Sequence, residues 1–438
     1  MSQSRRITCL ALGAVAALVA ACAQTPVGAP VTSGSSQVDV APGTGSGSEP
    51  TSTCVTNPAA VAAAAQPVTA TGPMPADLVT VLDGAAAASF AAAAAPGAVV
   101  AVQTPAGTWT KAYGMADPAA GVAMTTDVHT RIGSVTKTFI GSVLLQLATE
   151  HALSLDDTIG RYEPGVPHGD EVTLRQLADM TSGVASYTLD EAWVRSYLAD
   201  PARVWTPDEL VAIGIALPAE FAPGTEFSYS NTNTVLLGKV IEQVTGQPIG
   251  RVLADRVLGP LGLRETTFPD GSPVLPDPHP RGYTLQSPAA TPDRPVDATD
   301  WNPSWGWTAG EMTSTAADLL VYGRALGTGQ GLLPAATQVE RLTSFPGKAG
   351  YGIAMGCVNG WVGHSGELPG FNTSVFYDTS HATTVVVETN SDIASGGCTQ
   401  TATLTDNPSG LPCSDPATRI FVGLSEALGR PFTPLPKK

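Results

Sequence analysis

The chain has 438 residues, a formal net charge of −16 at pH 7 and a sequence pI near 4.7. This balance excludes nucleic-acid binding, because no basic stripe is present that could neutralise phosphates. The acidity suits a well-solvated surface and indicates no particular chemistry. No C-x-x-C or H-E-x-x-H spacing occurs, so we expect no metal ion and no cofactor.

The chain begins with the pattern of an exported lipoprotein. Arg5 and Arg6 precede an apolar run to Ala21, which is too short to span a bilayer comfortably as a helix. Small residues then lead directly into Cys22, which predicts cleavage of a signal peptide over 1–21 and a lipid on the Cys22 thiol. An ordinary secretory signal without a role for Cys22 is the alternative. Both interpretations export the protein, and the first anchors it to the outside of the cell membrane.

Two segments follow the signal. Residues 22–75 consist mainly of Ala, Pro, Thr, Gly and Ser, a composition that buries too little apolar surface to fold, so we expect a flexible tether. Residues 76–435 are predicted to form the folded domain. The four cysteines within and beside it permit three pairings in an oxidising compartment, and the polar loop between Cys398 and Cys413 favours that pair.

The folded domain has strand patterns at both ends and helical patterns between them. A helix is predicted over 76–95 and another over 415–429, and helices dominate from Ser134 to about Leu326. Alternation and β-branched content predict strands over 97–104, 107–114, 351–356, 371–378 and 383–390. We therefore expect an α/β (α+β) fold in which terminal helices flank a central antiparallel sheet and a mostly helical subdomain is inserted. A cleft between the two parts would suit a ligand.

The segment RIGSVTKTFIGSVLLQLATEHAL contains a candidate nucleophile and base. Ser134 and Lys137 are three residues apart at the start of an apolar helix, so their side chains can meet. Burial disfavours the lysine cation and allows the amine to take the serine proton. A solvated serine and a surface lysine are the alternative. No G-x-S-x-G is present, so the nucleophile elbow of α/β-hydrolases is excluded.

Two later motifs make the chain resemble the serine β-lactamase and D-Ala-D-Ala carboxypeptidase family. These are Tyr229-Ser230-Asn231, on a predicted loop before a helix, and His364-Ser365-Gly366, on a predicted strand. The order is that of the family, and the flanks VTLRQLADMTSG, VLGPLGLRETTF and AGEMTSTAADLL are similar too. The Tyr-x-Asn form and the histidine make the chain most similar to the carboxypeptidases and the class C-like branch. The resemblance covers nearly all of the folded chain and implies a β-lactamase/transpeptidase-like fold.

The resemblance implies a catalytic set of four residues. Ser134 attacks a carbonyl carbon and forms an acyl-enzyme, and Lys137, with Tyr229, moves the proton to the leaving group. His364 supports the proton network and the positive potential of the site. Singly, Tyr229 could be a core phenol and His364 a satisfied strand histidine.

The resemblance also implies how substrate is held. Asn231 would bind a substrate amide, although alone it could be a helix N-cap. Ser365 and Gly366 would line the cleft, and the backbone N–H groups of Ser134 and Glu367 would form the oxyanion hole. A proline-rich loop over 269–301, with Trp305 and Trp307 beyond it, is a candidate rim.

The chain departs from the carboxypeptidase pattern in charge. Gly356 stands about where those relatives have an arginine for the substrate carboxylate, and Glu367 would repel such a group. We expect an exported, monomeric serine hydrolase acting on small molecules or peptidoglycan peptides, at peptide, β-lactam or ester carbonyls. The alternatives are an esterase or amidase of the same fold, a non-catalytic penicillin-binding or sensor domain, and a structural envelope lipoprotein.

Overall fold

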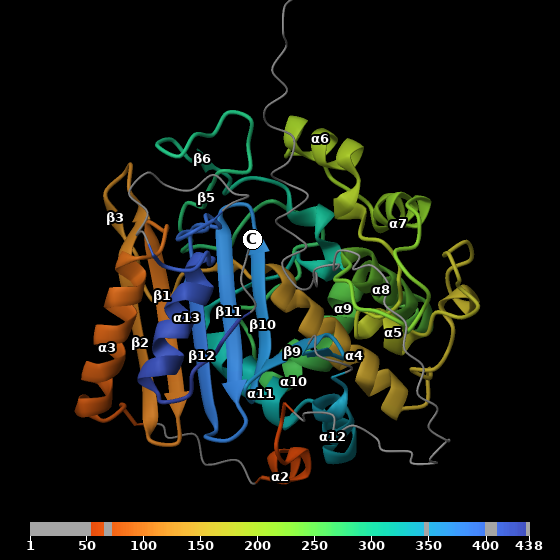
Figure 1. The fold of residues 1–438 in the computed structure, drawn as a ribbon, viewed down its shortest axis with the longest axis horizontal. Helices are drawn as coiled ribbons and strands as arrows, with labels where there is room; N and C mark the ends of the chain where they lie inside the picture. The colour runs from red at the N-terminus through yellow and green to blue at the C-terminus, as the bar shows by residue number, and fades with distance from the viewer. Residues whose placement is uncertain (1–53, 65–71, 346–349, 399–409, 435–438) are drawn as a thin grey trace, which may run out of the picture.

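The computed structural model describes residues 54–64, 72–345, 350–398 and 410–434. The predicted signal peptide and Cys22 lie outside the described residues. An eight-stranded antiparallel sheet runs through the described part (Figure 1). Its order is β3 (Val122–Ala123), β2 (Gly107–Asp117), β1 (Gly97–Thr104), β12 (Thr383–Thr389), β11 (Phe371–Asp378), β10 (Trp361–Leu368), β9 (Met355–Val358) and β8 (Tyr351–Gly352). Strands from the two ends of the chain therefore meet where β1 pairs with β12.

Two helices from the ends of the domain cover one face of the sheet. They are α3 (Ala76–Ala91) and α13 (Pro416–Ala427), which pack against each other (Figure 1). In β1, Ala98, Val100 and Val102 turn toward these helices, because alternate strand residues share a face. The expected helices at 76–95 and 415–429 are thus confirmed, each with a slightly earlier end.

The helical subdomain lies on the other side of the sheet. It begins with a 3₁₀ turn, η1 (Gly133–Val135), that runs directly into α4 (Thr136–Thr149), a helix buried on nearly all sides. The remaining helices are α5 (Leu174–Ala178), α6 (Glu191–Ala199), α7 (Pro207–Ala216), α8 (Asn231–Thr245), α9 (Ile249–Leu253), α10 (Gly259–Leu261), α11 (Ala316–Thr328) and α12 (Ala335–Thr343). Small paired strands join the parts: β4 (Thr130–Arg131) with β7 (Thr313–Ser314), and β5 (Tyr283–Thr284) with β6 (Val296–Asp297). The expected fold class is confirmed.

The segment expected as one strand over 351–356 is instead a tight hairpin. Strands β8 and β9 pair with each other across it, and Ala354 in its turn has a φ of 49°. A small side chain tolerates this left-handed conformation better than a bulky one. The hairpin forms the free edge of the sheet beside α12, and it brings Tyr351 opposite Gly356.

The expected flexible tether is wrong for residues 54–64. There, Asn57 caps a short helix, α2 (Pro58–Ala63), which packs against α11 and α12 at the lower edge of the molecule in Figure 1. A disulfide joins Cys54 to Cys357 in β9. Burial of Val55 and Ala62 adds apolar contact. The composition of the segment predicted no folding on its own, but a covalent link to β9 changes that balance.

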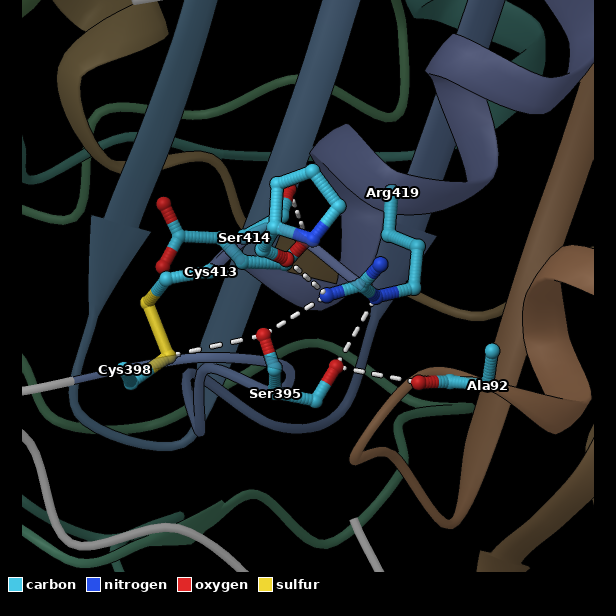
Figure 2. The surroundings of a disulfide bond; sticks show 8 residues. Ala92, Ser395, Cys398, Cys413, Ser414 and Arg419 are labelled. Carbon is cyan, nitrogen blue, oxygen red and sulfur yellow. Dashed lines mark hydrogen bonds between the residues drawn. A yellow bond between two sulfur atoms is a disulfide. The ribbon is translucent and has the colours of Figure 1, made fainter. Parts of the chain in front are cut away.

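The second disulfide, Cys398–Cys413, confirms the expected pair. Figure 2 shows it beside the Arg419 guanidinium of α13, which donates to Ser395 Oγ at 2.8 Å and Ser395 O at 2.6 Å. The Ser395 hydroxyl in turn donates to Ala92 O at 3.0 Å, just beyond α3. These contacts fix the start of α13, which lies at the edge of the candidate site.

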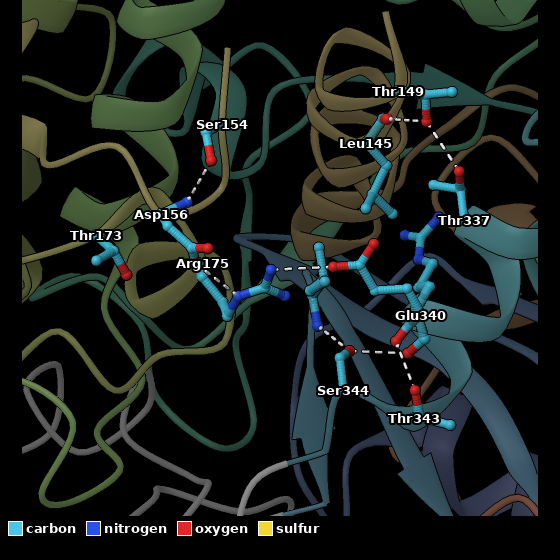
Figure 3. A network of polar contacts seen from close by, with 12 residues as sticks. Leu145, Thr149, Ser154, Asp156, Thr173, Arg175, Thr337, Glu340, Thr343 and Ser344 are labelled. Atoms are coloured by element: carbon cyan, nitrogen blue, oxygen red, sulfur yellow. Dashed lines mark hydrogen bonds and ion pairs between the residues drawn. The ribbon is translucent and has the colours of Figure 1, made fainter. Parts of the chain in front are cut away.

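Polar contacts join α12 to α4, to α5 and to the hairpin (Figure 3). Arg175 Nη2 lies 3.0 Å from Glu340 Oε1, and Thr149 Oγ1 lies 2.9 Å from Thr337 Oγ1. Such exposed pairs contribute only about 0–1 kcal/mol each. Their importance is positional, because Ser344, at the end of α12, accepts a hydrogen bond from the backbone of the hairpin that carries Tyr351.

Candidate active site

The candidate nucleophile and base meet at the start of α4. Ser134 lies in η1 and is half-exposed, whereas Lys137 is completely buried one turn later. Lys137 Nζ lies 2.9 Å from Ser134 Oγ and 2.6 Å from the carbonyl oxygen of Ala309. Burial holds the pKa of Lys137 well below its usual value. A neutral amine in contact with a hydroxyl can accept its proton.

Tyr229 lies over this pair, directly before α8. Lys137 Nζ is 4.9 Å from the centroid of the Tyr229 ring. The rings of Tyr351 and His364 also lie near Tyr229, with centroids 5.9 Å and 6.1 Å from its own. The second motif therefore reaches the first as expected, and Tyr351 is a neighbour that the sequence analysis missed.

His364 is held neutral within this cluster. Its Nδ1 contacts the carbonyl oxygen of Ser365, and its Nε2 lies 3.0 Å from the Tyr351 hydroxyl. The carbonyl requires a donor, so the proton belongs on Nδ1 and Nε2 accepts from Tyr351. Burial lowers the pKa of His364 to about 3. In this neutral form His364 adds no positive charge to the site, in contrast to what the resemblance implied.

Strand β10 brings two backbone amides together beside the nucleophile. A methyl group added to Gly366 would lie 3.0 Å from the backbone nitrogen of Ser134 and would collide with the carbonyl of Ile132. One added to Gly133 would collide with the backbone nitrogen of Glu367. Glycine at both positions thus allows η1 and β10 to approach closely. The N–H groups of Ser134 and Glu367 lie together, as an oxyanion hole requires.

One cleft of about 130 Å³ is lined by Ser134, Tyr229, Asn231, His364, Ser365, Gly366 and Glu367. Asn231, the first residue of α8, donates its backbone N–H to Ser186 Oγ at 3.1 Å and lines the cleft. Ser365 is exposed within it. The other lining residues come from the rim and from the start of α13: Gln286, Trp305, Gly306, Ala309, Gly310, Leu368, Pro369, Asn372 and Asp415.

The rim expectation is correct in part. Gln286 from the loop and Trp305 beyond it line the cleft, whereas Trp307 is buried in the core. The sequence did not single out Gln286, which lies between β5 and β6. No sequence spacing links it to the motifs, because it reaches the cleft only through the tertiary fold. Within the described residues no group of three or more metal-ligating side chains gathers.

The site combines a buried lysine, hydrogen-bonded to a serine at the start of a helix, with a large antiparallel sheet. This combination defines a serine hydrolase of β-lactamase-like fold. The sequence model described as Beta-lactamase matches residues 82–402, and the chain belongs to this family. Its two disulfides are typical of a protein folded outside the cytoplasm. Among the described helices, none has the length and apolarity needed to cross a membrane.

Relatives of several activities share the family. Penicillin-binding protein 4 of Amycolatopsis lactamdurans is 30% identical over 56% of this chain and 62% of its own length. Esterase EstB of Burkholderia gladioli is 33% identical over 37% of this chain and 44% of its own. The chain thus spans less than two thirds of these relatives. A D-stereospecific amidohydrolase from Streptomyces sp. has a TM-score of 0.65 at 34% identity, covering 72% of this chain and 94% of its own.

Proposed function

We propose that the protein hydrolyses amides or esters through an acyl-enzyme on Ser134. The main support for this proposal is the 2.9 Å contact between the buried Lys137 amine and the Ser134 hydroxyl. Ser134 Oγ attacks the carbonyl carbon while its proton passes to Lys137 Nζ. The same proton then leaves with the amine or alcohol, as the carbon–leaving-group bond breaks. Water then attacks the acyl carbon and gives a proton to Lys137. The ester bond to Ser134 Oγ breaks, Ser134 takes up that proton, and the acid is released.

The surrounding groups are assigned to positioning and charge. The N–H groups of Ser134 and Glu367 stabilise the oxyanion, a contribution of about 3–4 kcal/mol in other enzymes. Tyr229 relays the proton between Lys137 and the leaving group, and Asn231 and Ser365 bind the substrate amide. His364 acts through its bond to Tyr351, which fixes the ring beside Tyr229.

The substrate is proposed to lack a carboxylate next to the scissile bond. Among the described residues lining the cleft, none is a lysine or an arginine, whereas Glu367 and Asp415 are acidic. Gly356 pairs with Gly363 in the sheet and supplies no cation. Penicillins and D-Ala-D-Ala peptides carry the carboxylate that this cleft would repel. An amidase or esterase, as in two of the relatives, fits the charge better than a carboxypeptidase or β-lactamase.

The cellular setting is also part of the proposal. Cleavage before Cys22 and lipidation of its thiol would anchor the hydrolase outside the cell membrane as a monomer, within reach of small molecules and peptidoglycan peptides. Expression of the full chain and of Cys22→Ala tests this. The parent should fractionate with membranes and the variant should not.

The test of activity compares four substrates on the full chain and on Ser134→Ala. These are a p-nitrophenyl ester, a neutral amide, a penicillin and a D-Ala-D-Ala peptide. We expect turnover of the ester and the amide by the parent alone, with an acyl adduct on Ser134 by mass spectrometry. Preferential turnover of the penicillin or the peptide would reassign the protein to the β-lactamase or carboxypeptidase branch. A stable penicillin adduct without turnover of any substrate would make it a binding domain.

A further inference from the structure

One end of the cleft is rich in hydrogen-bond acceptors, around the side chain of Gln286. Gln286 Nε2 lies 2.7 Å from Asp392 Oδ2 and 3.4 Å from Glu367 Oε1. Two carboxylates on the same side fix the orientation of this amide, because only the NH₂ group can donate to them. The carbonyl oxygen, Gln286 Oε1, is thereby directed away from both. It makes no hydrogen bond within the part of the chain that the structure describes.

Asp392 holds Gln286 from behind. It is buried at 3% exposure, and it also accepts hydrogen bonds from Thr284 Oγ1 at 2.8 Å and from the Gly370 backbone at 3.2 Å. Three donors satisfy this carboxylate inside the protein. Asp392 therefore acts on the cleft only by holding Gln286 in place. Gln286 and Glu367 line the cleft themselves.

The neighbouring donors are already engaged. Asn372 Nδ2 donates to Gly366 O at 2.9 Å, and Asn372 Oδ1 accepts from the Ala417 backbone in the first turn of α13. Asn372 of β11 thus accepts a hydrogen bond from the N-terminal, positive end of α13. The acidic residue Asp415 directly precedes this helix. The Arg419 guanidinium donates to Ser395 (Figure 2) and to the carbonyl oxygen of Pro412, and Arg419 is not among the described residues that line the cleft. The other polar side chains that line this end of the cleft are those of Glu367, Gln286 and Asp415.

From this arrangement we infer that Glu367 and Gln286 bind a protonated primary amine of the substrate. An ammonium group has three N–H donors and a positive charge, which match two acceptors and a carboxylate. Glu367 also supplies one of the two oxyanion-hole amides, so the amine lies within one side-chain length of the scissile carbonyl. The substrate class is therefore amides or esters of amino acids with a free amino group. This inference rests on the proposed function but adds a recognition element to it.

The inference is tested by binding, without turnover. Phenylalaninol has the amine and an aromatic group that suits Trp305 but no carbonyl to attack. In 2-methyl-3-phenylpropan-1-ol, its matched uncharged partner, a methyl group replaces the ammonium. By calorimetry at pH 7 we expect the parent protein to bind phenylalaninol about tenfold or more tightly than the methyl compound. Glu367→Gln and Gln286→Leu should each abolish the difference. Glu171→Gln, an exposed carboxylate outside the cleft at 71% exposure, should retain it.

Equal binding of the two compounds by the parent protein would overturn the inference, as would a preference that survives Glu367→Gln. Thermal denaturation of each variant establishes that it is folded, so a lost preference reports the subsite. The ester and amide assays test the proposed function separately. Turnover without an amine preference removes the inference alone, whereas an amine preference without turnover removes the proposed function alone.

Discussion

Replacing Lys137 with methionine gives the sharpest test of the proposed chemistry. Methionine keeps an unbranched apolar stem and removes only the amine, which contacts Ser134 Oγ at 2.9 Å and Ala309 O at 2.6 Å. A positioned general base contributes about 10²–10⁴-fold to the rate, or about 3–5 kcal/mol of the barrier. We therefore expect kcat for a p-nitrophenyl ester to fall about a thousandfold. KM should change little, because the buried amine does not face bound substrate.

The same substitution predicts a signed effect on stability. Because the pKa of Lys137 is lower in the folded than in the unfolded state, the unfolded chain binds more protons below the usual lysine pKa. Parent stability therefore rises with pH toward alkaline values, whereas Lys137→Met lacks this rise. In urea denaturation, the free energy of unfolding of the variant relative to that of the parent should be highest near pH 7 and lower near pH 10.

Lys111→Met is the matched control. Lys111 forms a half-exposed ion pair with Asp83 at 2.6 Å, far from the cleft lining, so its loss should leave kcat unchanged. Retention of more than about a tenth of parental kcat by a folded Lys137→Met would refute the assignment of Lys137 as base. An equal loss in Lys111→Met would show that the assay reports folding instead.

Three further outcomes follow from buried contacts. Tyr351→Phe removes the hydroxyl bonded to His364 Nε2 and should lower kcat/KM about tenfold, measured with the same ester. Cys54→Ser removes a disulfide that joins residues 303 positions apart, and Cys398→Ser removes one that joins residues 15 positions apart. Chain entropy predicts that the free energy of unfolding falls by about 5–6 kcal/mol in the first variant and by about 3 kcal/mol in the second. The fall in Tm should therefore be larger for Cys54→Ser. Burial raises the pKa of Glu388 to about 8, so the parent loses stability as the pH rises from 5 to 8 and this carboxyl ionises more readily in the unfolded chain. Glu388→Gln lacks this loss, so its free energy of unfolding in urea should increasingly exceed that of the parent over this range.

Each of these has a contradicting result. Unchanged kcat/KM in Tyr351→Phe would make its bond to His364 structural only. A smaller Tm loss for Cys54→Ser than for Cys398→Ser would mean that the N-terminal segment adds little native contact. A constant difference between Glu388→Gln and the parent across that pH range would place the carboxyl pKa near its ordinary value.

The motifs were predictable because each rests on short-range geometry. Ser134 and Lys137 share one helical turn, and Tyr229 and Asn231 flank a helix start, so spacing alone places them. Strands such as β1 and β11 have the expected bounds, because their β-branched and aromatic residues suit a buried sheet. The family order of the motifs then predicted that three distant segments converge.

What the sequence could not show depends on tertiary contacts. Gln286 lies in a loop with no periodicity, and its role arises only when Asp392, 106 residues later, orients its amide. Tyr351 was assigned to a strand, but the turn at Ala354 directs it toward His364. The segment over 54–64 reads as tether by composition, and a disulfide to β9 overrides that composition. The neutral state of His364 likewise follows from burial, which local sequence does not report.

The charge of the bound substrate links the acidic rim to the buried base. Lys137 must be unprotonated to accept the Ser134 proton, and its pKa responds to any charge that a substrate brings into the cleft. A substrate carboxylate would stabilise the lysine cation and weaken the base, besides being repelled by Glu367. A substrate ammonium bound at Glu367 and Gln286 acts in the opposite direction, since a second cation nearby lowers the pKa of Lys137 further. The cleft that selects an amine therefore also keeps its base in the reactive form.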